Sequence, residues 1–162
     1  MLYLGIDPGL TGAIALLDRG GLLECADIPT CSNGQESGSM KRWVDAGGLR
    51  SLLSQWAVRH DFAGRGLTAA VERPIPMPSL PAQTIASQFD TFGVLRALVE
   101  ARADTTQYPT PQSWKKMFGI GADKSKALAT AAALYPDAPV NRVKDHNRAE
   151  AILIAHHLLR MA

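Results

Sequence analysis

The sequence has few cysteines and no long apolar run. Cys25 and Cys31 are the only cysteines among its 162 residues, and neither lies in a CxxC or His-rich pattern of the kind that binds zinc. Structural or neutral thiols are therefore favoured over a disulfide. No segment approaches the roughly 18 apolar residues that span a bilayer, and no charged leader precedes a hydrophobic stretch. We expect a soluble, cytoplasmic protein with no membrane partner.

A strong excess of either charge is also absent. The 17 Lys and Arg residues barely outnumber the 15 Asp and Glu residues, so the formal net charge is +2. This balance permits a polyanionic partner without requiring one, because the placement of charges matters more than their sum. The length and the 46% apolar composition predict a single domain over residues 1–162 with one core.

The N-terminal third is typical of β-strands. Short apolar segments at 2–7, 12–18 and 21–29 are separated by tight turns, which predicts a three-stranded antiparallel meander. The polar segment 31–42 is rich in Gly and Ser and is expected to form a surface loop. Residues 43–59 have apolar side chains at mostly helical spacing and predict the first helix.

Strand and helix patterns alternate in the rest of the chain. A continuously apolar strand is predicted over 66–72, a stiff Pro-rich loop over 73–83, a helix over 83–103 and a last strand over 105–109. Further helices are predicted at 111–119, 123–136 and 145–161. This order predicts an α/β fold, in which a mixed five-stranded sheet, an antiparallel meander plus parallel strands, is flanked by helices.

Acidic residues stand at the ends of two predicted strands. Asp7 closes the first strand, and Glu72 closes the strand before the Pro-rich loop. In such sheets the functional crevice lies beyond the carboxyl ends of the strands. The last helix adds Glu150 and His146, which are four residues apart on one face, and Asp145 at the N-cap, which can turn to the first amides or to the crevice. Taken alone, Asp7 could begin a turn, Glu72 could form a surface ion pair with Arg73, and Asp145 could be a helix cap. Glu150 differs, because apolar positions flank it on a helix that should pack.

Several motifs together resemble the RuvC-type Holliday junction resolvases, especially the shorter bacteriophage members. They are "GIDPGLTGAIALLD", the acid that closes "AAVERP", a last helix that opens "DHNRAEAILIA", and the Pro, Trp and Lys segment "PQSWKKMFGIGADKSKALATAAALYP". The resemblance covers nearly the whole chain and implies a ribonuclease H-like fold. It also implies an endodeoxyribonuclease that resolves four-way DNA junctions in the cytoplasm of a bacterium or of a phage-infected cell.

The family's site consists of four acidic or metal-binding residues. The resemblance implies these metal ligands: Asp7, Glu72, Glu150, and either Asp145 or His146. The four acids of that set are the implied catalytic residues. In the family the third ligand usually stands three or four residues before the last acid, and here those positions hold Asn147 and His146. The third ligand therefore stays open.

Phosphodiester hydrolysis explains why such a cluster is needed. An activated water, stabilisation of the charge that develops on phosphorus and help for the departing 3′-oxygen can all come from two divalent ions roughly 3.5 to 4 Å apart. Hard oxygen ligands suit Mg²⁺, with Mn²⁺ as an alternative, and no nucleotide cofactor is expected. We expect Asp7 to bridge both ions, and the glycines that follow it would let a sugar-phosphate backbone approach closely.

Basic residues lie near these motifs. Six are expected to contact DNA phosphates: Arg73, Lys115, Lys116, Lys124, Lys126 and Arg148. A solvated helix face is the alternative for the lysines, and Arg73 can equally orient Glu72. Ile75 or Met77 of the Pro-rich loop is a candidate for contact with unstacked bases.

The expected partners are four-way junction DNA and a second copy of the chain. Two symmetric nicks imply a homodimer, with the helix over 83–103 as the candidate interface, unless that helix is only core. Two other functions remain open. One is another ribonuclease H-like nuclease, acting on an RNA–DNA hybrid or processing RNA as YqgF-like proteins do. The other is a non-catalytic junction-binding protein, which would keep the lysines and tolerate loss of the acids.

Overall fold

A mixed β-sheet forms the centre of the computed structural model, which describes residues 1–32, 34 and 42–162. Its five strands run in the order β3-β2-β1-β6-β7. They are β1 (Leu2–Asp7), β2 (Ala13–Asp18), β3 (Gly21–Asp27), β6 (Leu67–Val71) and β7 (Thr105–Gln107). Strands β1 to β3 pair antiparallel, whereas β6 pairs parallel with both β1 and β7. The predicted fold class, a meander continued by parallel strands, is confirmed.

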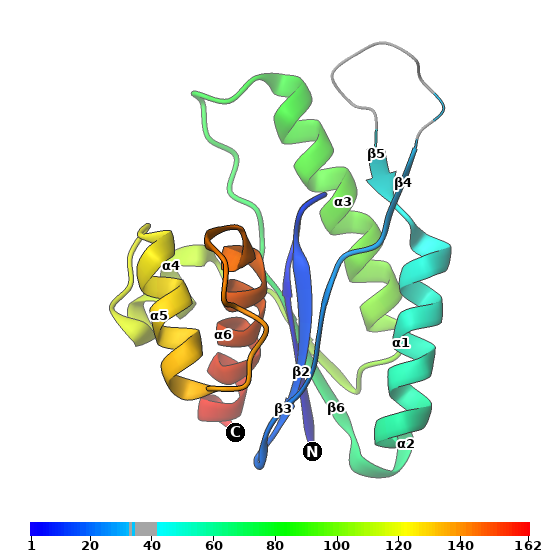
Figure 1. Ribbon diagram of the computed structural model, residues 1–162. Helices are drawn as coiled ribbons and strands as arrows, with labels where there is room; N and C mark the ends of the chain where they lie inside the picture. Colours follow the sequence, from blue (N-terminus) through cyan, green and yellow to red (C-terminus); the bar gives the residue numbers. More distant parts are fainter. Residues whose placement is uncertain (33, 35–41) are drawn as a thin grey trace.

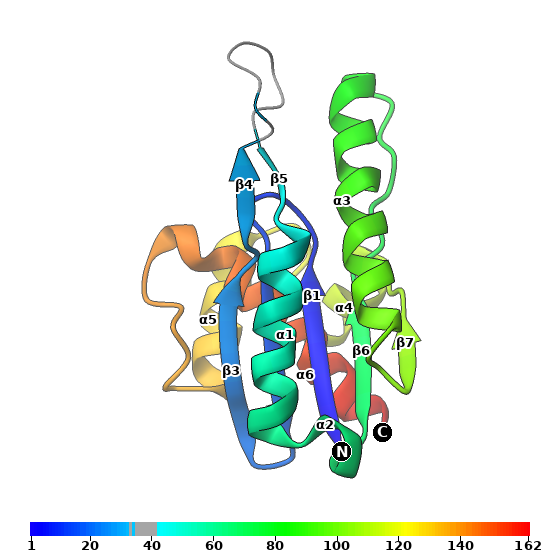
Figure 2. The ribbon, with the colours of Figure 1, turned by 90° about the vertical axis from the view of Figure 1, so that its right-hand side faces the viewer.

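Helices cover both faces of this sheet (Figure 1). On one face lie α1 (Ala46–His60), the short α2 (Phe62–Arg65) and α3 (Ala82–Glu100), which face the viewer in Figure 2. On the other face lie α4 (Pro111–Phe118), α5 (Lys124–Leu134) and α6 (His146–Met161), the last preceded by a 3-10 turn, η1 (Val143–Asp145). Two apolar layers, one under each set of helices, make up the core.

The central strand β1 fixes the position of α6. Every residue of β1 is buried, and its alternate side chains point into the two apolar layers. Gly5 faces α6 at a place where a side chain would overlap the backbone of Ala151 and Ala155. The helix therefore lies directly on the strand, and the start of α6 is held beside the carboxyl end of β1.

One predicted helix is wrong at its start. The sequence predicts a helix over 43–59, but Arg42–Val44 form strand β5, which pairs with β4 (Thr30–Ser32). Helix α1 begins after Asp45, because the Asp45 carboxylate accepts a hydrogen bond from the Gly48 amide at 2.9 Å and caps the helix. The two ends of the loop predicted over 31–42 instead belong to strands β4 and β5. Residues 33 and 35–41 of the predicted loop lie outside the described part.

The remaining predicted elements occur with boundaries shifted by a few residues. Short α2 was not predicted, and the last helix is preceded by η1. No regular element forms over residues 72–81, as expected for the Pro-rich loop. In the part of the chain that the structure describes, no helix is long and apolar enough to cross a membrane.

Candidate active site

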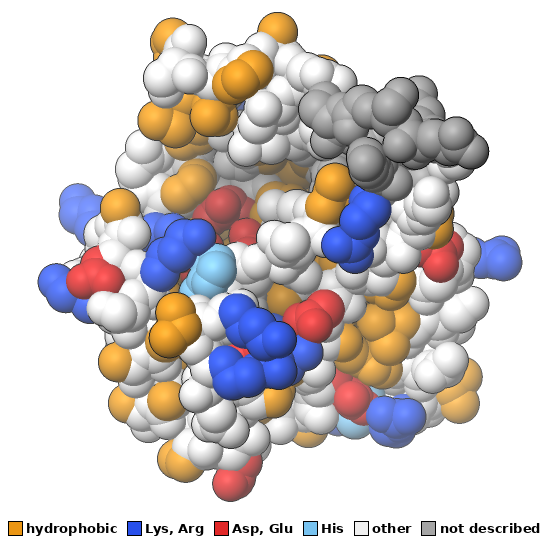
Figure 3. Space-filling view, turned by 45° about the horizontal axis from the view of Figure 1, so that its top comes forward, with side chains coloured by type: hydrophobic (Ala, Val, Ile, Leu, Met, Phe, Trp, Pro, Cys, Tyr) orange, Lys and Arg blue, Asp and Glu red, His pale blue; other side chains and the backbone are white. Residues whose placement is uncertain are grey.

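Three carboxylates gather at one end of the sheet. Asp7 is the last residue of β1, and Glu72 follows β6, with its amide donating to the Ile6 carbonyl at 3.0 Å. Because β1 and β6 are parallel neighbours, both acids leave the same edge. Helix α6 brings Glu150 to this edge, and both Asp7 and Glu150 are 8% exposed. Figure 3 shows acidic side chains inside a hollow on this end of the molecule.

Mutual repulsion marks these carboxylates as one cluster. Burial raises the pKa of Asp7 well above its usual range, and the charges of Glu150 and Glu72 raise it further. Burial also raises the pKa of Glu72 to about 7, although a hydrogen bond from Trp114 opposes this shift. A site that makes its own carboxylates hard to ionise is suited to a cation, which would remove the repulsion.

Helix α4 holds two of the three carboxylates. The indole Nε1–H of Trp114 donates to Glu72 Oε2 at 2.6 Å, and the Trp114 side chain is fully buried. The next residue, Lys115, places its Nζ 2.8 Å from Glu150 Oε1 and 5.1 Å from the centre of the Trp114 ring. The sequence predicts a phosphate contact for Lys115 and no role for Trp114. A Trp-Lys pair on a helix that precedes the acidic helix was the available signal.

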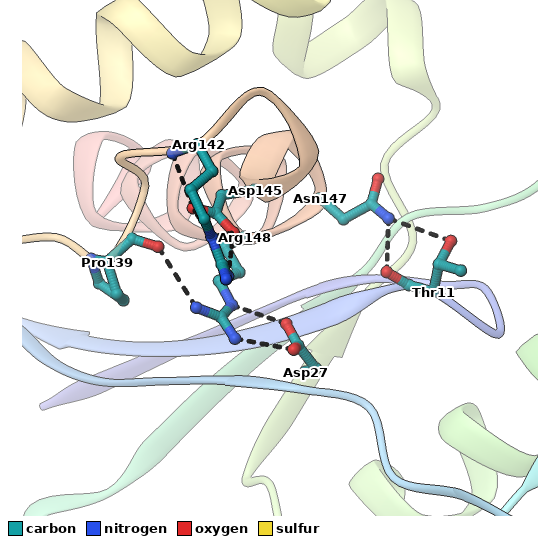
Figure 4. A network of polar contacts seen from close by, with 7 residues as sticks. All are labelled: Thr11, Asp27, Pro139, Arg142, Asp145, Asn147 and Arg148. Carbon is teal, nitrogen blue, oxygen red and sulfur yellow. Dashed lines mark hydrogen bonds and ion pairs between the residues drawn. The ribbon is translucent and has the colours of Figure 1, made fainter.

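Asp145 belongs to a different network (Figure 4). Its carboxylate accepts from the Arg142 amide at 2.9 Å and from Arg142 Nη2 at 2.7 Å. These bonds lower the pKa of Asp145 to about 2, with a smaller contribution from Arg148. The charged groups that shift the pKa of Asp7 are Glu150, Glu72 and two lysines, and Asp145 is not among them.

The two residues after Asp145 face different partners. His146 Nε2 lies 3.0 Å from Lys124 Nζ, and its Nδ1 lies 3.3 Å from the Val143 carbonyl oxygen. The charge of Lys124 also lowers the pKa of Asp7, so His146 contacts a lysine that acts on the carboxylate cluster, and His146 itself lines a hollow together with Asp145. Asn147 Nδ2 instead donates to the Thr11 carbonyl and, at 3.1 Å, to the Thr11 hydroxyl. The turn after β1 is thereby tied to the start of α6.

The six basic residues selected from the sequence differ in availability. Lys115 and Lys124 contact Glu150 and His146, and Arg148 forms a two-pronged ion pair with Asp27 at 2.6 and 2.7 Å. The other three are exposed and have no ion-pair partner within the described ranges: Arg73, Lys116 and Lys126.

The donor chemistry of the cluster fits a hard divalent cation. Its three carboxylates offer oxygen ligands, and the cluster contains no thiolate. Within residues 1–32, 34 and 42–162, no three His, Cys, Asp or Glu side chains already converge on one point as they would around a bound ion. Lys115 instead supplies the positive charge next to Glu150.

Comparison with known proteins gives matches in structure only. No family model matches the chain, and no curated protein matches its sequence. The structure of Thermus thermophilus RuvC aligns with a TM-score of 0.59 at 16% identity, covering 99% of this chain and 96% of that one. The same protein in complex with a Holliday junction substrate aligns at 0.61 and 15%, covering 100% and 97%. The yeast mitochondrial Holliday junction resolvase Ydc2 aligns at 0.51 and 14%, covering 97% and 77%. The resemblance to RuvC-type resolvases is therefore confirmed for the fold, which this chain shares over nearly its entire length.

Proposed function

We propose that this protein is a metal-dependent endonuclease that resolves four-way DNA junctions. The observation that carries the proposal is the cluster of Asp7, Glu72 and Glu150, set at the carboxyl ends of β1 and β6 and at the start of α6. The cluster lies in a fold shared with a RuvC whose structure was solved with a Holliday junction substrate. The burial and mutual repulsion of these acids are hard to account for in a protein that only binds DNA.

Asp7, Glu72, Glu150 and His146 are the proposed ligands of Mg²⁺, or of Mn²⁺. We assign His146 rather than Asp145 because His146 contacts Lys124 beside the cluster, whereas Asp145 is bound to Arg142. When bound, the ions would activate a water and stabilise the charge on phosphorus and on the departing 3′-oxygen.

The chain's own residues would orient the acids and hold the DNA. Trp114 fixes one oxygen of Glu72 through its indole N–H. Lys115 neutralises Glu150 and is placed to donate to a phosphate oxygen next to the cut. Exposed Arg73, Lys116 and Lys126 would contact neighbouring phosphates. The turn after Asp7 is tight, because a side chain at Gly12 would overlap the backbone of Asp7 and Gly9.

A homodimer is the proposed active form, because two symmetric nicks need two sites related by a twofold axis. Helix α3 is the proposed interface, because it has both a buried face and an exposed apolar residue. Leu95 and Val99 are fully buried in the core, whereas Phe89 is 38% exposed toward the end of the helix nearer the Pro-rich loop. Ile75 and Met77 of that loop are also exposed and would reach unstacked bases at the junction.

Cleavage of three labelled substrates would test this proposal. The substrates are a synthetic four-way junction, a linear duplex with the same arms and a matching RNA–DNA hybrid, each incubated with Mg²⁺ or with chelator. We expect paired, symmetric, Mg²⁺-dependent nicks in the junction alone. The variant Asp7→Asn should still bind the junction but should not cut it. Cutting of the hybrid would instead indicate a ribonuclease, and junction binding without cutting would indicate a structural protein.

A further inference from the structure

We propose that a basic hollow beside the start of α6 is a second DNA-backbone site, which holds a duplex arm of the junction. This inference rests on the proposed function and extends it to a surface that the six basic residues chosen from sequence do not define. The hollow has a volume of about 410 Å³. It is lined by the turn after β1, the end of β3, β5 and the segment around η1, and its basic residues are Arg42, Arg142 and Lys144.

The hollow and the lysines of α4 and α5 flank the first turn of α6. His146 lines the hollow and also contacts Lys124 of α5, so it joins the two basic regions, and Asn147, which also lines the hollow, contacts Thr11. Asp145, just before the helix, also lines the hollow. Figure 3 shows Lys and Arg side chains on more than one side of the separate hollow that contains acidic side chains. A DNA molecule whose cut phosphate lies at the acids would therefore meet positive charge in both directions along its backbone.

Both acids that line the hollow are in ion pairs with arginines. Asp145 is bound by Arg142, and Asp27 is bound by Arg148 through two hydrogen bonds (Figure 4). Arg142 remains 55% exposed in this pair, and its Nη1 makes no hydrogen bond within the described part of the chain. A guanidinium held in place by a buried carboxylate, with an unused N–H edge in solvent, is preorganised to donate to phosphate.

Within the residues that the structure describes, two further cations have no carboxylate partner. Lys144 is exposed and makes no hydrogen bond or ion pair there, and the Arg42 guanidinium donates to the Thr30 hydroxyl. The three cations of the hollow come from β5 and from the segment around η1. They match the regularly spaced phosphates of a nucleic-acid strand, each of which can contact a different side chain. Double-stranded DNA is therefore the ligand that we assign to the hollow.

Salt-dependent binding in chelator would test the site without cleavage. The variants are Lys144→Gln and the double variant Arg42→Gln/Lys144→Gln. The matched control is Arg19→Gln, an exposed arginine in the turn between β2 and β3, at the opposite end of the sheet. Fluorescence anisotropy would measure the affinity for a labelled junction from 50 to 200 mM NaCl, and thermal melting would verify the fold of each variant.

We expect the double variant to bind several-fold more weakly at 50 mM NaCl. Its plot of log affinity against log salt should be less steep by about 0.9 for each lost phosphate contact, whereas Arg19→Gln should follow the wild type. The difference between wild type and double variant should vanish for a junction whose arms are shortened to a few base pairs. Equal slopes for the double variant and Arg19→Gln would overturn this site and leave the proposed function intact. Failure of the wild-type protein to bind any DNA would overturn both.

Discussion

At the scale of single residues, the orientation of Glu72 depends on one buried donor. Its carboxylate accepts from Trp114 Nε1 at 2.6 Å, and the Trp114 ring is enclosed by the apolar layer under α4 and α6. A carboxylate that must present an oxygen to a metal ion is most effective when its other oxygen is already fixed. Trp114 thus contributes through position, without touching substrate.

The variant Trp114→Phe should keep the aromatic packing and remove this donor. We expect the Mg²⁺ concentration for half-maximal cleavage to rise about tenfold, in line with the loss of a residue that orients a metal ligand. Terbium luminescence would report the same loss of affinity without cleavage. Trp56→Phe is the matched control, because Trp56 is also buried, at 3% exposure, but lies in the other apolar layer. An unchanged Mg²⁺ requirement in Trp114→Phe would show that the hydrogen bond does not orient Glu72.

Substitutions at Asp145 and His146 should have separable effects. His146→Ala removes a proposed ligand and should raise the Mg²⁺ requirement. Asp145→Asn weakens the contact with Arg142 that holds η1, so it should lower the melting temperature and the cleavage rate with little change in the Mg²⁺ requirement. Mg²⁺ titrations of both variants under the same conditions would measure this difference. The opposite pattern would assign the ligand to Asp145.

These residues also show what the sequence can and cannot reveal about the site. Asp7 and Glu72 were identifiable because each ends an apolar strand and falls within a recognisable motif. The contact between Glu72 and Trp114 joins residues 42 positions apart, so no local pattern encodes it. Asp145 was ambiguous for a related reason, since an acid at a helix start can face either side, and only the position of Arg142 decides which.

At the scale of elements, the seating of α6 on β1 sets the geometry of the site. The sequence predicted both elements, because their apolar residues are continuous, but it gave no measure of how closely they approach. The missed β4–β5 pair has a similar origin: three-residue strands carry too little pattern to be recognised, and their pairing joins residues far apart in sequence, such as Cys31 and Trp43.

Gly5→Ala should separate α6 from β1. The added methyl would overlap the backbone of Ala151 and Ala155, which cannot move without displacing Glu150. We expect the free energy of unfolding to fall by about 1–3 kcal/mol or more, and cleavage to fall further than stability alone explains. Gly93→Ala is the matched control, because a methyl at this position in α3 meets nothing within 4 Å and should stabilise the helix by about 0.5–1 kcal/mol. Chemical denaturation would compare the two, and equal stability would show that the contact is loose.

At the scale of the whole molecule, the carboxylate cluster lowers the stability of the metal-free protein when its acids are ionised. The surface ion pairs lower the pKa values of Asp18, Glu24 and Asp27, as is usual for carboxylates that gain a partner on folding. The cluster does the reverse, because burial and repulsion raise the pKa values of Asp7 and Glu72. Folding therefore favours the protonated form of these two groups, and ionising them costs folding free energy.

The raised pKa values of the cluster predict how the stability of the protein depends on pH when a chelator keeps it free of metal. A carboxyl with a higher pKa in the folded chain contributes its full stabilisation below its unfolded pKa and loses it as the pH rises through its folded pKa. For Glu72 that window runs from 4.5 to about 7. Glu72 alone should lower the free energy of unfolding by about 3 kcal/mol across this window. The paired surface carboxylates act at lower pH, but His156 and His157, whose pKa values burial lowers, act in the opposite sense within it. The contribution of the cluster is therefore measured as the difference between the wild type and a variant.

Removing the Asp7 charge should reduce the fall, and a bound cation should oppose it. In chelator Asp7→Asn should be more stable than the wild type at pH 8, because it loses a buried charge, whereas the part of the fall that comes from the burial of Glu72 and its repulsion by Glu150 should remain. Mg²⁺ should stabilise the wild type at pH 8 but not the variant. Asp137→Asn, at an exposed acid after α5, should leave the wild-type profile unchanged. Thermal melting from pH 4.5 to 8, with Mg²⁺ or with chelator, would measure all of these effects. Equal stability of Asp7→Asn and the wild type at pH 8 in chelator would mean that neither burial nor the neighbouring carboxylates destabilise ionised Asp7, and the cluster would then lose its strongest argument for binding a cation.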